Sequence, residues 1–202
     1  MRFIPVLNIL SILITPMAGV MLISALVDFS FKDDNWISFF SSAIITLFIG
    51  MTVYLATRGK NNNHLDLRQA FILTTFSWIS IALFGALPFY LSTLNLSFTD
   101  SFFESMSGIT TTGSTILNNI EYSPPGILVW RSLLQWLGGI GVIVMALAVL
   151  PMLSIGGMQL FKTENLETPE KVIPRATGLA RGIFLVYSIL TIFWAFLLYI
   201  SG

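Results

Sequence analysis

Residues 101–115 read SFFESMSGITTTGST, a stretch rich in hydroxyl side chains and glycine between two long apolar runs. Phe98, Phe102 and Met106 follow a helical spacing. Gly108 is a residue type that commonly ends a helix. About eleven residues of helix rise roughly 16 Å, which is half the hydrocarbon thickness of a membrane. The stretch therefore predicts a short helix that enters a membrane halfway, followed by a segment that returns in extended form.

The return segment (residues 109–115, ITTTGST) is predicted to bind a cation. Its carbonyl groups have no ladder partners, so at membrane depth it must be buried in protein or line a water-filled path. A desolvated cation can be the missing partner, because carbonyl oxygens replace its hydration shell. The helix C-terminus adds partial negative charge, and Gly113 permits a backbone conformation that a Cβ atom disfavours. The alternative is an outer loop rich in serine and threonine that binds no ion.

Glu104, within the short helix, has two interpretations. An acid inside a membrane is a functional candidate, and here it would lend negative potential to the outer mouth of a pore. Alternatively it belongs to a helix cap, because Ser101 and Glu104 have the spacing of a capping box. Ser97 or Thr99 can also cap the start of this helix.

The composition is that of an integral membrane protein. Of the 202 residues, 55% are hydrophobic and 10% are charged, and the mean hydropathy is +0.84, whereas a soluble domain has about 25% charged residues. The formal net charge is zero, so no global field attracts nucleic acid. The absence of cysteine excludes disulfides, thiolate metal sites and cysteine nucleophiles. The single histidine, His64, is expected to be solvated in a polar turn.

Five apolar segments are each near the length that crosses a hydrocarbon core of roughly 30 Å. The first follows Arg2 in the manner of a signal peptide, but it is longer than the roughly 15 residues of a signal's apolar region. We therefore expect a retained helix. The third is expected to kink or end near Pro88. The predicted spans are 3–27, 36–57, 70–94, 127–153 and 182–200.

Basic residues favour one orientation. With five spans and the N-terminus inside, eight basic residues lie on the inner side, and only Lys32 and Arg131 lie on the outer side. The segment 95–126 is then extracytoplasmic, and the inner connection 154–181 is either a contact for a cytosolic partner or a solvated linker. The inner basic residues are Arg2, Arg58, Lys60, Arg68, Lys162, Lys171, Arg175 and Arg181.

Three further sets of residues have open alternatives. Arg131 could pair with Glu104 or Glu121 and brace the loop, or its side chain could reach to the interface. Glycines in the fourth span could allow bending beside a pore, or close helix packing. Acids at the outer side could concentrate cations, or be ordinary interface residues. The glycines are Gly138, Gly139 and Gly141, and the acids are Asp28, Asp33, Asp34 and Asp100.

Three stretches together resemble the Trk/Ktr/HKT potassium transporter superfamily, and within it the TrkH family. They are FFESMSGITTTGST (102–115), LVWRSLLQWLGGIGVIVMALAVLPML (128–153) and GGMQLFKTE (156–164). The resemblance implies an all-α polytopic membrane protein in which four helix–pore loop–helix repeats, similar to those of potassium channels, surround one pore. Two extra transmembrane helices precede the first repeat.

On this resemblance the chain has three parts. Residues 1–60 are the two N-terminal helices, 67–157 are the first repeat with its pore helix and filter at 98–115, and 158–202 are a cytoplasmic linker and a truncated first helix of the second repeat. The chain then supplies one filter strand where the family has four. It is expected to be an N-terminal portion, and the alternative is a pore assembled from several chains.

The resemblance also implies potassium uptake across the bacterial inner membrane, with K+ as the transported ion and no organic cofactor. Expected partners are a second copy in a homodimer, a cytosolic nucleotide-binding regulatory subunit of the TrkA type and membrane lipid, with no nucleic acid. One alternative is a non-conducting fragment or assembly subunit. Another is a membrane enzyme that uses hydroxyls and Glu104, although no histidine or second acid lies nearby. The expected ligands are Ile109, Thr110, Thr111, Thr112 and Gly113, supported by Ser114, Glu104 and Arg131.

Overall fold

The computed structural model describes residues 3–59, 67–118, 120–153 and 172–201. Within these residues every regular element is helical and no strand occurs, which confirms the all-α prediction. The elements are α1 (Ile4–Ser30), α2 (Trp36–Thr57), α3 (Leu67–Gly85), α4 (Leu87–Tyr90), α5 (Phe98–Ile109), the 3-10 turn η1 (Ile120–Tyr122), α6 (Pro125–Leu153) and α8 (Val172–Ser201). His64 and most of the predicted linker lie outside the described residues.

Five helical segments are long and apolar enough to cross a membrane, as predicted. The second coincides with the predicted span 36–57, because a polar turn bounds the apolar run at each end. The third is interrupted at Ala86, close to the predicted kink. Pro88 has no N–H, and its ring would strike the carbonyl four residues before it in a continuous helix. The indole of Trp130 donates a hydrogen bond to the carbonyl of Gly85 at this break, at 3.0 Å.

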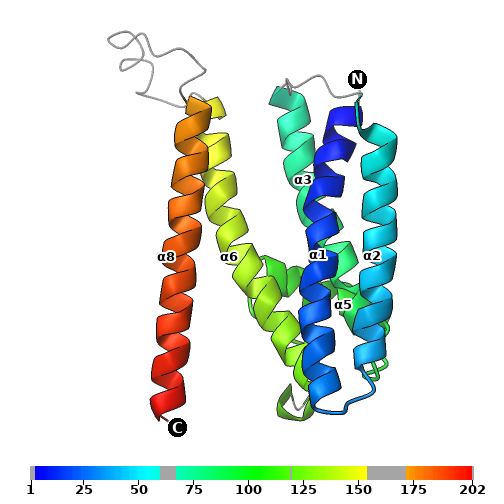
Figure 1. The fold of residues 1–202 in the computed structure, drawn as a ribbon. Coiled ribbons are helices and arrows are strands. Elements are labelled where there is room, and N and C mark those ends of the chain that lie inside the picture. The colour runs from blue at the N-terminus through cyan, green and yellow to red at the C-terminus, as the bar shows by residue number, and fades with distance from the viewer. Residues whose placement is uncertain (1–2, 60–66, 119, 154–171, 202) are drawn as a thin grey trace. The chain divides into compact units, whose positions relative to one another are not determined.

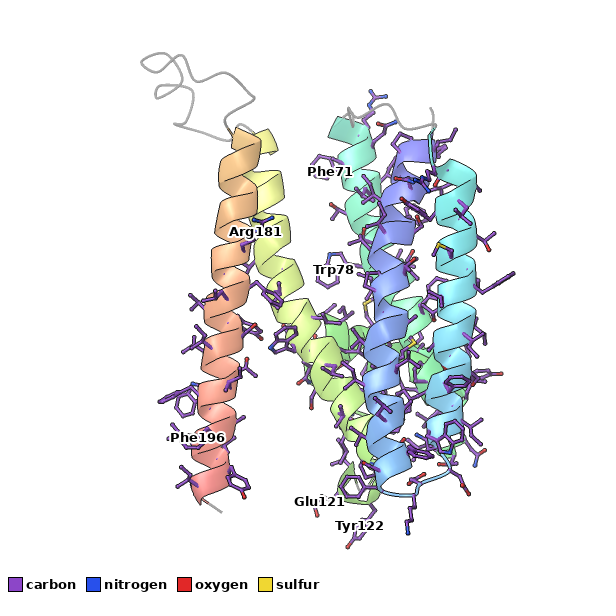
Figure 2. The ribbon with its side chains drawn as sticks, viewed as in Figure 1. Phe71, Trp78, Glu121, Tyr122, Arg181 and Phe196 are labelled. Carbon is purple, nitrogen blue, oxygen red and sulfur yellow. The ribbon has the colours of Figure 1, made fainter. Side chains whose placement is uncertain are left out.

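The chain divides into two compact units, residues 1–139 and 140–202. In the first unit α1 packs against α2 and α3, and α5 packs against α3 and α4 (Figure 1). Phe71 and Trp78 point away from α1 on the other side of α3 (Figure 2). The core of this unit joins the long helices to the end of α5 and the start of α6. It includes Met17, Met21, Phe39, Phe89, Ile109, Ile127, Trp130 and Leu134.

Candidate functional site

Helix α5 begins at Ser97, one of the two caps that the sequence predicted. The Ser97 hydroxyl accepts the Asp100 N–H at 3.1 Å and donates to the Asp100 carboxylate at 2.7 Å. Ser97 is thus the cap, rather than Thr99. The predicted capping box of Ser101 and Glu104 is wrong, because the helix has already begun by that point and Ser101 donates to the Ser97 carbonyl.

Helix α5 ends at Ile109, one residue beyond the predicted stop at Gly108. The N–H groups of Thr111 and Thr112 donate to the carbonyls of Gly108 and Ser107, both at 3.0 Å, which is a Schellman motif. Thr111 occupies the left-handed position of this motif at φ +58°. A β-branched residue there is an outlier, so the surrounding contacts must hold it in place.

The return segment turns away from α5 without forming regular structure. Gly113 has φ +78°, the conformation for which the sequence indicated glycine. Within the described part of the chain, the carbonyls of Thr110, Thr111, Thr112 and Gly113 accept no hydrogen bond. The four residues are exposed at the end of the 12-residue helix α5, where their carbonyl oxygens could accept a cation. Their role as ligands stays a prediction.

Hydroxyl groups hold the two ends of the return segment. Thr110 donates to the Met106 carbonyl at 2.8 Å and lies 2.9 Å from the Thr112 hydroxyl. Ser107 donates to the carbonyl of Ser114 at 2.6 Å. The Ser114 carbonyl is therefore already satisfied, which fits a supporting role for this residue.

Behind the return segment lies a buried ion pair. Glu104 and Arg131 are 1% and 8% exposed, and their side chains approach to 2.6 Å. The other Glu104 oxygen accepts the Thr115 hydroxyl at 2.7 Å and the Ile116 N–H at 2.6 Å. Of the alternatives for Arg131, the structure shows pairing with Glu104. Glu121 lies beside Tyr122 at the end of the first unit where α1 ends (Figure 2).

Thr115 links both members of this pair to the return segment. Its hydroxyl donates to Glu104 and accepts from Arg131 at 2.5 Å and from the Leu117 N–H at 3.0 Å. Thr115→Val keeps the shape and removes these bonds, so we expect the free energy of unfolding to fall by about 1–3 kcal/mol. Denaturation of the purified protein in detergent measures this, with Thr52→Val on the exposed face of α2 as control. Equal stabilities of the two variants would show that the hydroxyl contributes nothing.

Helix α6 passes close to the C-terminal end of α5. A Cβ atom added at Gly138 would overlap the carbonyl oxygen of Ile109, and one added at Gly108 would lie 3.1 Å from Leu134 Cβ. Gly141 has no atom within 4 Å of such a position. Of the two interpretations of these glycines, the structure therefore shows close packing at Gly138. Ile109 itself is buried, unlike the four residues that follow it.

Asp28 is a residue whose place the sequence did not indicate. It is buried in the first unit, whereas Asp34 is exposed and Asp100 lies in the first turn of α5, bonded to Ser97. Its carboxylate accepts hydrogen bonds from Asn35 and from the N–H of Gly126. Because 98 positions separate Asp28 from Gly126, no local pattern pointed to this contact.

Comparisons with known proteins agree on one family. A family model described as "TrkH: Cation transport protein" matches residues 37–201. The chain is 40% identical over 201 residues to the Trk system potassium uptake protein TrkI of Halomonas elongata. It is 37% identical over 206 residues to the Trk system potassium uptake protein TrkH of Escherichia coli K12.

A solved structure supports the same relationship. The crystal structure of the potassium transporter TrkH from Vibrio parahaemolyticus superposes with a TM-score of 0.86 at 33% identity, over 100% of this chain and 40% of that one. All of this chain is likewise matched by the two curated relatives, but it spans only 41% and 42% of their lengths. On the family match over residues 37–201, with the fold and the sequence identities in agreement, the chain belongs to the TrkH family of cation transport proteins.

Proposed function

We propose that this chain is the N-terminal portion of a potassium transporter and that its return segment is one strand of the ion filter. The observation that carries the proposal is the row of carbonyls from Thr110 to Gly113 at the end of α5, which accept no hydrogen bond from the described residues. The related proteins TrkH and TrkI are named for potassium uptake. The described residues supply one such row, and the remaining ligands would come from other parts of the transporter.

The proposed mechanism changes no covalent bond. A potassium ion exchanges water for carbonyl oxygens, and the partial negative charge at the C-terminus of α5 favours its entry. The membrane potential drives uptake with about 2.3 kcal/mol per charge for each 100 mV. Rigid placement of the oxygens matters because their number and geometry decide which ion replaces its water at least cost. The Glu104–Arg131 pair and the Ser107–Ser114 bond would provide that rigidity.

The same proposal covers organisation, partners and location. Residues 1–60 would be two helices outside the repeat, 67–157 the first helix–pore loop–helix repeat, and 158–202 a linker and the first helix of the next. The protein would lie in the bacterial inner membrane with its N-terminus in the cytoplasm, since basic residues concentrate on that side. It would act as a homodimer with a TrkA-like regulatory subunit.

Gly113→Ser tests the filter, with Gly59→Ser as a matched control. Both glycines have positive φ, at +78° and +80°, and neither would bring a new Cβ within 3.4 Å of another atom. Both substitutions therefore strain the backbone alike, but only Gly113 lies in the return segment. In the transporter that contains this chain, we expect Gly113→Ser to weaken apparent K+ affinity at least tenfold and to reduce discrimination against Na+. Gly59→Ser should leave both unchanged.

Equal effects of the two substitutions would contradict the assignment of the filter. Potassium flux into liposomes from these 202 residues alone separates the remaining alternatives. We expect no selective flux, because one row of carbonyls cannot surround an ion. Selective flux that Gly113→Ser abolishes would instead favour a pore assembled from several copies of this chain.

A further inference from the structure

The first turn of α6 is held by a carboxylate from α1. Asp28 is 0% exposed, and its two oxygens accept the Gly126 N–H at 2.5 Å and the Asn35 side-chain amide at 2.9 Å. Asn35 is also fully buried, and its own oxygen accepts the Thr93 N–H at 3.3 Å. The Asp28 side chain on α1 is thus bonded directly to the turn before α2 and to the start of α6. Through Asn35 it is also connected to the loop before α5.

Helix chemistry explains why a carboxylate suits this place. Gly126 is the second residue of α6, so its N–H has no partner within the helix. The partial positive charge of a helix N-terminus stabilises an anion there. Pro124, which precedes the helix, has no side-chain oxygen to cap it. A Cβ atom at Gly126 would overlap the Asp28 carboxylate, so glycine is required for this approach.

One side of α6 contacts other helices of the first unit at regular intervals. Gly126, Trp130, Leu134 and Gly138 are spaced by four, which places them in one row along the helix. Gly126 contacts the Asp28 carboxylate, and Trp130 contacts the Gly85 carbonyl. Leu134 contacts Gly108, and Gly138 contacts the Ile109 carbonyl. From the next position after Trp130, Arg131 bonds Glu104 and Thr115. A displacement of α6 along its axis or about it would therefore change contacts at both ends of the return segment.

We propose that Asp28 is a positioning residue for ion selectivity. By fixing the first turn of α6, it sets where Gly138 meets the end of α5, and so where the carbonyls of the return segment point. The two N-terminal helices would then act on the filter through this carboxylate. The proposal rests on the proposed function of the return segment, but its structural half can be tested separately.

The transport test compares Asp28→Ala with Asp34→Ala, an exposed acid in the same region. Asp28→Ala leaves the Gly126 N–H and the Asn35 amide without their acceptor. We expect at least a tenfold rise in the apparent KM for K+ and at least a tenfold loss of K+ over Na+ discrimination, with maximal uptake per molecule much less affected. Asp28→Asn keeps one acceptor oxygen for the Gly126 N–H. It should therefore restore a substantial part of both the K+ affinity and the K+ over Na+ discrimination. Asp34→Ala should behave as the parent.

The structural test uses spin labels at Thr99→Cys on α5 and Ser132→Cys on α6, both exposed in a sequence that has no cysteine. Asp28→Ala should shift or broaden the distance distribution by about the rise of one helical residue, 1.5 Å. Gly126→Ala displaces the carboxylate from the other side and should give the same result. If Asp28→Ala does not fold, the Gly126→Ala variant provides the distance measurement in its place.

The outcomes separate the two proposals. A parent protein that takes up no K+ refutes the proposed function, while the spin-label distances still decide whether Asp28 positions α6. Unchanged distances in both variants overturn the inference. So does unchanged discrimination in a folded Asp28→Ala transporter. A loss of stability with normal KM and discrimination would show that Asp28 is structural only, which also overturns it.

Discussion

Glu104→Gln is expected to lower the free energy of unfolding by about 3–5 kcal/mol, because it leaves the Arg131 charge buried without a counter-charge. The carboxylate accepts hydrogen bonds from Arg131, Thr115 and Ile116. A glutamine offers one oxygen for these donors and turns an amide N–H2 toward some of them. Denaturant unfolding of the purified protein in detergent measures the loss.

A double-mutant cycle identifies the cause of this loss. Arg131→Gln should be comparably destabilising, since it leaves Glu104 buried and unpaired. The double variant Glu104→Gln, Arg131→Gln should recover a large part of the loss, because neither charge then remains. Glu121→Gln is the control, as Glu121 is exposed, and should change stability by less than about 0.5 kcal/mol. Additive single effects would mean that the two side chains do not stabilise each other.

The long helices could be predicted from the sequence because a membrane imposes one simple requirement on them. An apolar run of about 20 residues must cross as helix, and polar turns end it. That requirement predicted the span 36–57 correctly. The break in the third span was predicted near Pro88, where the structure has it. The short helix α5 followed from its aromatic spacing, and Ser97 was one of the two caps predicted for its start. Ser101 and Glu104, whose spacing suggested a capping box, lie inside the helix instead.

The end of α5 shows why local signals misled. Glycine is the expected residue at a helix stop, yet Gly108 lies inside the helix and Thr111 takes the left-handed position. Gly108 is small for another reason, since Leu134 packs against it. Propensity alone does not favour a β-branched residue at positive φ. The hydrogen bonds from the N–H groups of Thr111 and Thr112 to the carbonyls of Gly108 and Ser107 close this turn and hold Thr111 there.

The supporting contacts of the candidate site were partly predictable. Two opposite charges in an apolar setting are expected to find each other, so Glu104 was one of two partners foreseen for Arg131. Asp28 was missed because its partner is a backbone N–H far along the chain. One signal was present, since Pro124 before Pro125 and Gly126 leaves α6 without a side-chain cap of its own. A helix that lacks a cap suggests that an acceptor comes from elsewhere in the fold.

Gly138→Ala is expected to disturb the return segment at the end of α5. The new Cβ would overlap the carbonyl oxygen of Ile109, which is a backbone atom and cannot rotate away. Either α6 moves or the turn at Thr111 opens, and both displace the carbonyls from Thr110 to Gly113. Inserting a methyl group into such a contact costs about 1–3 kcal/mol. We expect at least a tenfold loss of K+ over Na+ discrimination, measured as competition between the two ions for uptake by the transporter.

Gly141→Ala is the matched control, because it changes the same helix one turn later where an added Cβ meets no atom within 4 Å. Alanine there should preserve uptake and slightly favour the helix. Equal uptake and discrimination in Gly138→Ala and Gly141→Ala would show that the contact of α6 with the Ile109 carbonyl does not control the return segment. The inference that Asp28 acts on the return segment through α6 would then also be wrong. If Gly138→Ala alone lost discrimination while the protein remained folded, the position of α6 would be established as a determinant of which ion the return segment accepts.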